Sequence, residues 1–167
     1  MVGKTEIVLM QKLVIPDRQQ VEIWLDQAGH EFWACDRCDG LHISSLQSLD
    51  GVLDSRLFIE PFGILFSTEL DLKAGSAFLV QADMTRLNLG LPTLKLFLEM
   101  LESGHLLLVA SDVLMTSKGV CYSQFSEFLA MTLEAKSWLY RECQSMHYIL
   151  SEQEHCLPPV EGKFSFH

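Results

Sequence analysis

The chain has 167 residues, which is enough for one sizeable core but too few for two domains with separate cores. Its 12 Lys and Arg against 22 Asp and Glu give a net charge of −10, which disfavours nucleic acid and anionic lipid surfaces as direct partners. A hydrophobic fraction of 49% and a mean hydropathy of +0.19 favour a thick core, an apolar binding surface, or both.

The N-terminal segment does not resemble an export signal. Its apolar run, residues 7–10, is shorter than the hydrophobic region of a signal peptide, and no later stretch approaches the ~20 apolar residues of a bilayer span. Five cysteines, an odd number, fit reduced thiols better than a disulfide framework. We therefore expect a cytoplasmic protein without membrane insertion.

The first periodic segment follows Pro16. Apolar residues at i, i+3, i+4 and i+7 predict an amphipathic helix that ends at Gly29: Val21, Trp24, Leu25 and Ala28. Shorter runs at 32–35 and 41–43 then predict two strands. Residues 36–40 between them include an Asp-Gly dipeptide, which is typical of a β-hairpin.

After a second turn signal at Asp50-Gly51, two runs predict antiparallel strands at 56–60 and 62–68, separated by Pro61. Residues 76–87 fit either state, and we favour a helix. Pro92 then precedes a second set of apolar residues with helical spacing: Leu94, Phe97, Leu98 and Leu101. This pattern predicts a helix that ends at Ser103-Gly104.

Residues 105–115 predict a strand whose apolar first half is covered on both faces or shielded by a partner. From Cys121 one apolar stripe predicts a long helix to about Leu150: Phe125, Phe128, Ala135, Leu139, Cys143 and Met146. Pro158-Pro159 forbids its continuation. The predicted class is therefore α+β, an antiparallel sheet of about five strands with an N-terminal helix, one or two middle helices and a long C-terminal helix.

The predicted hairpin carries Cys35, Cys38 and His42, a spacing that could bring three zinc ligands together. No fourth ligand lies nearby, and structural zinc sites usually present a second paired set, so the spacing favours a structural role. A redox pair would need its first Cys at a helix N-terminus, which a hairpin lacks. We therefore assign no metal ligand, and a metal- or redox-linked sensor using these residues stays an alternative.

No other cluster indicates catalysis or a cofactor. Cys143 and His147 would share a helix face, but a structural role is favoured because no further ligand is spaced with them. The chain has neither a G-x-S-x-G elbow nor a Gly-rich phosphate loop. Asp50 and Asp54 are interpreted as solvated turn charges. The sequence thus predicts a protein that is not an enzyme, with no catalytic, cofactor-binding or metal residue.

Four segments, in this order, resemble the YbjN family of enterobacterial regulators, which includes the AmyR proteins. They are FWACDRCDGLHI at 32–43, DGVLD at 50–54, GILFS at 63–67 and GVCYSQF at 119–125. The resemblance runs from about Met10 to the terminal Phe166-His167. It implies an N-terminal extension at 1–9, a single YbjN-type domain at 10–157 and a tail at 158–167. Cys121 stands where the family has a small hydroxyl residue, which argues against a family-wide thiol role there.

The resemblance implies a fold similar to type III secretion chaperones and a cytoplasmic regulator of exopolysaccharide production, motility, biofilm, stress response and virulence. Together with the acidic charge and the apolar surplus, it predicts a non-enzymatic regulator that binds another protein. We expect no nucleic-acid partner, no cofactor and no small-molecule substrate, and fold analogy leaves a homodimer open. The alternative is a type III secretion-like chaperone for a client protein.

Overall fold

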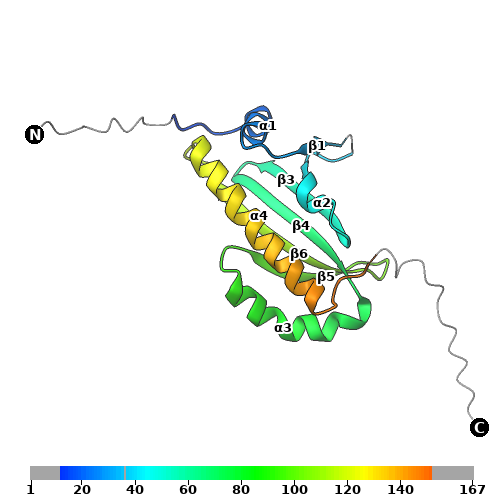
Figure 1. The fold of residues 1–167 in the computed structure, drawn as a ribbon. Helices are drawn as coiled ribbons and strands as arrows, with labels where there is room; N and C mark the ends of the chain where they lie inside the picture. The colour runs from blue at the N-terminus through cyan, green and yellow to red at the C-terminus, as the bar shows by residue number, and fades with distance from the viewer. Residues whose placement is uncertain (1–11, 36, 152–167) are drawn as a thin grey trace, which may run out of the picture.

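The computed structural model describes residues 12–35 and 37–151, and Figure 1 shows their arrangement. The helices are α1 (Arg18–Gln27), α2 (Ser44–Gln47), α3 (Ala77–Gly90) and α4 (Tyr122–Ser145), with a 3-10 turn at Ala74–Ser76. The strands are β1 (Phe32–Ala34), β2 (Leu41–Ile43), β3 (Val52–Glu60), β4 (Gly63–Leu72), β5 (Lys95–Met100) and β6 (Leu106–Met115).

The six strands form one sheet in the order β1-β2-β3-β4-β6-β5, and every neighbouring pair is antiparallel. The predicted α+β class is confirmed, with one strand more than expected. The hairpin of β1 and β2 is confirmed, and two strands lie on either side of Pro61 as predicted, but β3 begins earlier, at Val52, and β4 extends further, to Leu72. Strand β6 lies between β4 and β5, and residues Leu106–Ala110 are buried on both faces.

Local signals account for α1. The Asp17 side chain accepts a hydrogen bond of 2.8 Å from the Gln20 backbone N–H and so caps the helix. The apolar stripe of the helix is buried, and Gly29 follows the end of the helix with φ +75°, a backbone conformation that glycine adopts without strain.

The prediction of a helix after Pro92 is wrong, because residues 95–100 form strand β5. Leu94, Leu96 and Leu98 are spaced by two residues, as in a strand with one apolar face. The segment therefore fits a strand pattern as well as the i, i+3, i+4 pattern of a helix. Pairing decides the outcome, since β5 supplies one side of the hydrogen-bonding ladder of β6. Residues 77–90, by contrast, form the favoured helix α3.

Helix α4 ends earlier than predicted, at Ser145 instead of about Leu150. His147 adopts a left-handed φ of 57°, after which the chain turns back and Ile149 bridges to Leu72 of β4. His147 therefore does not share a helix face with Cys143, which is fully buried in the core. The sequence patterns also missed the single-turn helix α2, which follows β2 directly.

Helices α1, α3 and α4 lie on one face of the sheet, and α4 runs in roughly the same direction as the long strands β4 and β6 (Figure 1). Two apolar clusters fill this interface, one around Phe125 and Leu129 at the α1 end and one around Leu139 and Cys143 at the α3 end. Between them lies a polar seam of four buried residues: Ser55, Thr68, Thr132 and Lys136.

Lys136 is 3% exposed and its Nζ donates hydrogen bonds to three oxygens. These are Phe66 O at 3.1 Å, Thr68 Oγ1 at 3.0 Å and Ala110 O at 2.6 Å, and Nζ also lies 4.4 Å from the Phe66 ring centre. Burial lowers the pKa of the ammonium well below its ordinary value, an effect that the charge of Asp112 opposes.

The alternation of β-strands sends the remaining sheet side chains to the side opposite α4, and we call this the open face. No helix among the described residues packs on it. The cross-strand pairs define its members: Trp33, His42, Arg56, Phe58, Leu65, Glu69, Phe97, Val109 and Val113.

Replacing Lys136 by Met should change how stability depends on pH. Because the folded state lowers the Lys136 pKa, the folded chain binds this proton less tightly than the unfolded chain. Wild-type unfolding free energy should therefore rise, relative to Lys136→Met, by up to about 1.4 kcal/mol per pH unit as pH approaches 10.5 from below. Urea unfolding at several pH values measures this difference. The exposed Lys118→Met is the control and should parallel the wild type, and a parallel Lys136→Met curve would contradict the prediction.

Alanine at Gly51 should destabilise the fold more than alanine at Gly29. Both glycines have a left-handed φ, +78° and +75°, so the backbone strain is shared. A Cβ at Gly51 would collide with Ile149 Cγ2, whereas one at Gly29 meets open space. We expect a loss of about 1 kcal/mol for Gly29→Ala and about 2 to 4 kcal/mol for Gly51→Ala in denaturant unfolding. Equal losses would show that the contact does not constrain the turn.

Candidate functional site at the β1–β2 hairpin

The structure brings Cys35, Cys38 and His42 together, and we call these three residues the thiol–imidazole cluster. Their ligand atoms all lie within 4.8 Å of one another. Cys35 Sγ is 2.7 Å from Cys38 Sγ, and Cys38 Sγ is 3.3 Å from His42 Nε2. Over residues 12–35 and 37–151, no other group of three His, Cys, Asp or Glu side chains converges in this way.

The hairpin explains the convergence. Cys35 directly follows β1 and His42 is the middle residue of β2, opposite Trp33. Pairing across the two strands therefore brings the Cys38 turn back over His42. The Trp33 ring stacks on the imidazole with ring centres 3.8 Å apart and planes within 3°, which restricts the orientation of the imidazole.

Gly40 lets the turn lie close to β3. A Cβ at this position would stand 3.0 Å from Arg56 Cδ and 3.2 Å from Phe58 Cε1, closer than ordinary carbon contacts. A larger residue would push the turn, and with it Cys38, away from the sheet. The Asp-Gly dipeptide therefore serves packing as well as turn formation.

A second layer of charge supports the cluster from β3. His42 Nδ1 lies 3.1 Å from Asp54 Oδ1, an ion-pair distance at an angle outside hydrogen-bonding geometry. Asp54 Oδ2 accepts a 2.6 Å contact from Arg56 Nε, and Arg56 Nη2 lies 3.7 Å from Glu69. The carboxylate therefore faces the imidazole nitrogen on the side away from the thiols.

Cys38 and Cys143 lie in different surroundings, which shift their pKa values in opposite directions. The hydrogen bond from Cys35 is the main cause that lowers the pKa of Cys38 to about 6, and the Gly40 backbone N–H, Arg56 and His42 add to it against partial desolvation. Burial raises the pKa of Cys143 to about 12. Cys38 is thus a thiolate near neutral pH and Cys143 a structural thiol. All four described cysteines are free.

This arrangement can hold a metal ion or react as a thiolate. Sequence reasoning found the three residues of the cluster but missed their surroundings, because Asp54 was interpreted as a solvated turn charge whereas it lies within β3. The bulge between Val52 and Asp54 shifts the register there. The alternation around Arg56 and His42 was the only signal that could have placed Asp54 near the imidazole.

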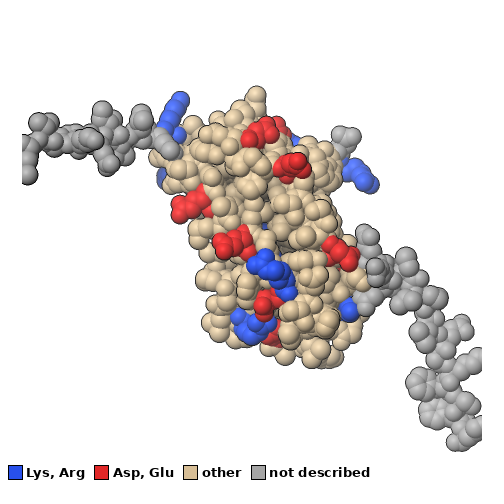
Figure 2. All heavy atoms as spheres, in the orientation of Figure 1, with Lys and Arg blue, Asp and Glu red and all other residues tan. Residues whose placement is uncertain are grey.

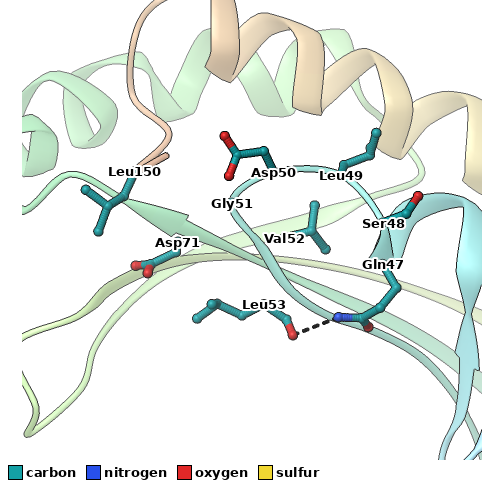
Figure 3. Close-up of a pocket in the computed structure, with 9 residues that line it drawn as sticks. All are labelled: Gln47, Ser48, Leu49, Asp50, Gly51, Val52, Leu53, Asp71 and Leu150. Atoms are coloured by element: carbon teal, nitrogen blue, oxygen red, sulfur yellow. Dashed lines mark hydrogen bonds between the residues drawn. The ribbon is translucent and has the colours of Figure 1, made fainter. Parts of the chain in front are cut away.

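A second candidate is the cavity of about 240 Å³ where the end of the chain meets the sheet (Figure 3). Its wall is held by backbone hydrogen bonds, from Asp71 N to Gly51 O at 2.8 Å and from Leu150 N to Asp71 O at 2.9 Å. The Gln47 amide bonds Leu53 O at 2.9 Å across its rim. The buried Asp71 carboxylate pairs with His105 Nδ1 at 3.1 Å. These contacts join the loop to the sheet, and we assign the cavity a structural role.

Comparison with known proteins supports the resemblance noted in the sequence. Residues 17–145 match the YbjN family, described as "Putative bacterial sensory transduction regulator". The chain is 29% identical over 158 residues to "Uncharacterized protein YbjN" of Escherichia coli K12, a match that covers 95% of this chain and all of the relative. Shigella flexneri has a relative with the same name and the same identity and coverage.

A solved structure is also similar. It is titled "Crystal structure of YbjN, a putative transcription regulator from E. coli" and matches with a TM-score of 0.79 at 31% identity. The match covers 84% of this chain and 99% of that one. In the described part of this chain, no helix is both long and apolar enough to cross a bilayer.

Alkylation should distinguish the cysteines. In reduced, metal-free protein at pH 7, Cys38 should react with iodoacetamide fastest and Cys143 slowest, because only the thiolate is nucleophilic. The Cys38 rate should fall as pH drops through about 6. Cys35→Ala removes the main cause of the lowered pKa and should move this pH dependence upward. Peptide mass spectrometry measures each rate, and equal rates for Cys38 and Cys143 would refute the assignment.

Proposed function

Because this chain belongs to the YbjN family, we propose that it is a non-enzymatic regulator that acts by binding another protein through the open face of its sheet. The proposal includes a cytoplasmic location and the processes that the family resemblance implies: exopolysaccharide production, motility, biofilm, stress response and virulence. The family description as a sensory transduction regulator supports the regulatory part.

The observation that carries the proposal is apolar surface on the open face. Phe97 is 40% exposed and Val113 37% exposed, and Leu65, the cross-strand partner of Val113, is half-buried. Val113, Leu65 and Phe58 are cross-strand neighbours and form one continuous area, whereas Phe97 lies on β5 opposite Val109, beyond Ser111. Contiguous apolar surface on a regular scaffold favours recognition of another protein.

The charges of this face indicate the chemistry of the partner. Glu60, Glu69 and Glu99 lie on this face, as does Lys95 of the edge strand β5. Arg56 is already paired with carboxylates, so acidic side chains predominate. The whole chain carries −10. We therefore propose a partner segment that is apolar and bordered by Lys or Arg, since complementary charge favours association.

The helix-covered side also exposes apolar side chains, on α3 and α4, but these do not belong to a regular sheet surface. There, acidic and basic side chains are interspersed over a mostly uncharged surface (Figure 2). Phe78 is 91% exposed on α3 but lies apart from the apolar area of the open face. This contrast makes Phe78 a suitable control position for a test of the open face.

A photo-crosslinking residue in place of Phe97 should capture a partner in cells, because that position borders the proposed contact area. The captured peptide should be apolar and contain Lys or Arg. Adding Val113→Asp places a carboxylate in the contact and should lower the crosslinking yield at least about tenfold, which corresponds to about 1.4 kcal/mol of binding. Mass spectrometry of the crosslinked products measures both outcomes.

The same residue at Phe78 is the matched control and should not capture this partner. Unfolding curves of both labelled proteins establish that they fold alike. Capture of the same protein from both positions, or an unchanged yield with Val113→Asp, would contradict the proposal. Capture of a second copy alone would assign the face to a homodimer. A partner whose solubility depends on co-expression would identify a client chaperone instead.

A further inference from the structure

We propose that Cys35, Cys38 and His42 form a reversible binding site for a borderline-soft metal ion of the Zn²⁺ class, with one coordination position left open. Its role as the signal input of the regulator rests on the function proposed above. The binding itself rests only on the geometry of the hairpin.

The donor set selects the class of metal. Two thiolates and one imidazole suit Zn²⁺, whereas hard cations such as Mg²⁺ and Ca²⁺ prefer oxygen ligands. Three protein ligands leave a fourth tetrahedral position for water or a ligand of another molecule. Three protein ligands are too few for a closed structural site, but they are the number expected for a site that exchanges its metal.

The distances are compatible with one shared ion. Bond lengths of about 2.3 Å to sulfur and 2.0 to 2.1 Å to nitrogen place tetrahedral donor atoms roughly 3.5 to 3.8 Å apart. The Cys38 Sγ to His42 Nε2 distance of 3.3 Å is already close to this value. The two sulfur atoms, 2.7 Å apart, must separate by about 1 Å. Rotation of either half-buried side chain at the turn can supply this movement.

The surroundings of His42 are those of a metal ligand. A ligating imidazole uses one nitrogen for the metal and presents the other to a carboxylate, which sets its tautomer. Here Nε2 faces Cys38 and Nδ1 faces Asp54 at 3.1 Å, and both Nδ1 and Asp54 Oδ1 are buried without a hydrogen bond. With Nε2 bound to a metal, the proton is held on Nδ1, where a small rotation would direct it to Asp54.

Charge also favours a cation. Asp54 and Glu69 face the single guanidinium of Arg56, and two thiolates would add two further negative charges. A divalent ion would neutralise the thiolates as their protons leave for solvent.

The location connects the site to the proposed docking surface. His42 pairs with Arg56, and Arg56 pairs with Ser67, so the cluster and the open face share adjacent strands. Metal binding would move Cys35 and Cys38 apart and hold the Cys38 turn beside His42, which would alter the pairing of Arg56 with Asp54 and Glu69. It would thereby change the charge next to the apolar area.

The test is titration of the reduced full-length chain with Zn²⁺ in competition with a chromophoric chelator. We expect one ion per chain with a Kd below about 1 μM, as three strong donors supply at least about 8 kcal/mol. Cys38→Ser should weaken binding more than about 100-fold. Asp54→Asn, which removes the carboxylate charge beside His42 and Arg56 but no ligand, should weaken it about 10- to 100-fold. Co²⁺ in place of Zn²⁺ should give a near-ultraviolet thiolate charge-transfer band that Cys38→Ser abolishes.

Cys121→Ser is the matched control, because this thiol caps α4 away from the cluster and should leave Zn²⁺ binding unchanged. Unfolding curves of each variant separate loss of ligands from loss of fold. Absence of stoichiometric Zn²⁺ in folded wild type, or equal binding in Cys38→Ser, would overturn the site. The metal site would also be overturned if Cys35 and Cys38 form a reversible disulfide in cells and the reduced protein binds no metal.

Failure of this proposal and failure of the proposed function give different results. Zn²⁺ binding to purified protein does not depend on a partner, and crosslinking from Phe97 does not require the metal. If both hold, Zn²⁺ should change the crosslinking yield at least about twofold in wild type and leave Cys38→Ser unchanged. An unchanged wild-type yield would remove the input role while the metal site stands.

Discussion

The packing of α4 against a single face of the sheet determines most of this structure. The long helix presents Phe125, Leu129 and Leu139 to strands whose inward side chains are apolar, and this contact forms both core clusters. Lys136 lies between the clusters and directs three hydrogen bonds to the central strands β4 and β6. A buried ammonium is tolerated only with such partners, so it defines how the helix is positioned over the sheet.

One-sided packing has a direct consequence for function. With the helices on one face, every second residue of each strand is left on the other, whatever its chemistry. Strand β6 limits the exposure of Leu107 and Val109 by placing them beneath longer neighbours such as Phe97 and Glu99. Phe97 on β5 and Val113 on β6 stay partly exposed, while Phe58 on β3 and Leu65 on β4 are half-buried.

The thiol–imidazole cluster lies at the β1–β2 end of this same face. Its members come from the β1–β2 turn and the short strand β2, while the charges that support them come from the longer strand β3. A local change in the hairpin therefore acts on Arg56, which is part of the sheet. In the function proposed here, this arrangement would place the proposed metal site beside the proposed docking surface.

Much of the fold could be predicted from local patterns. Apolar periodicity predicted α1 and α4, Gly29 the end of α1, and turn chemistry the hairpin at Gly40 and the turn at Asp50-Gly51, because these signals act between residues close in sequence. The residues of β5 satisfied both a helical and a strand period, and only pairing with β6 selected the strand. The early end of α4 likewise depends on the pairing of Ile149 with Leu72.

The candidate site likewise has residues that the sequence identified and residues that only the structure revealed. The spacing of Cys35, Cys38 and His42 was visible in the sequence because one hairpin holds all three. The roles of Asp54, Arg56 and Lys136 were not, because a charged residue is assigned to solvent unless its partners are known. Those partners lie on other strands, at positions that only the register of the sheet and the docking of α4 determine.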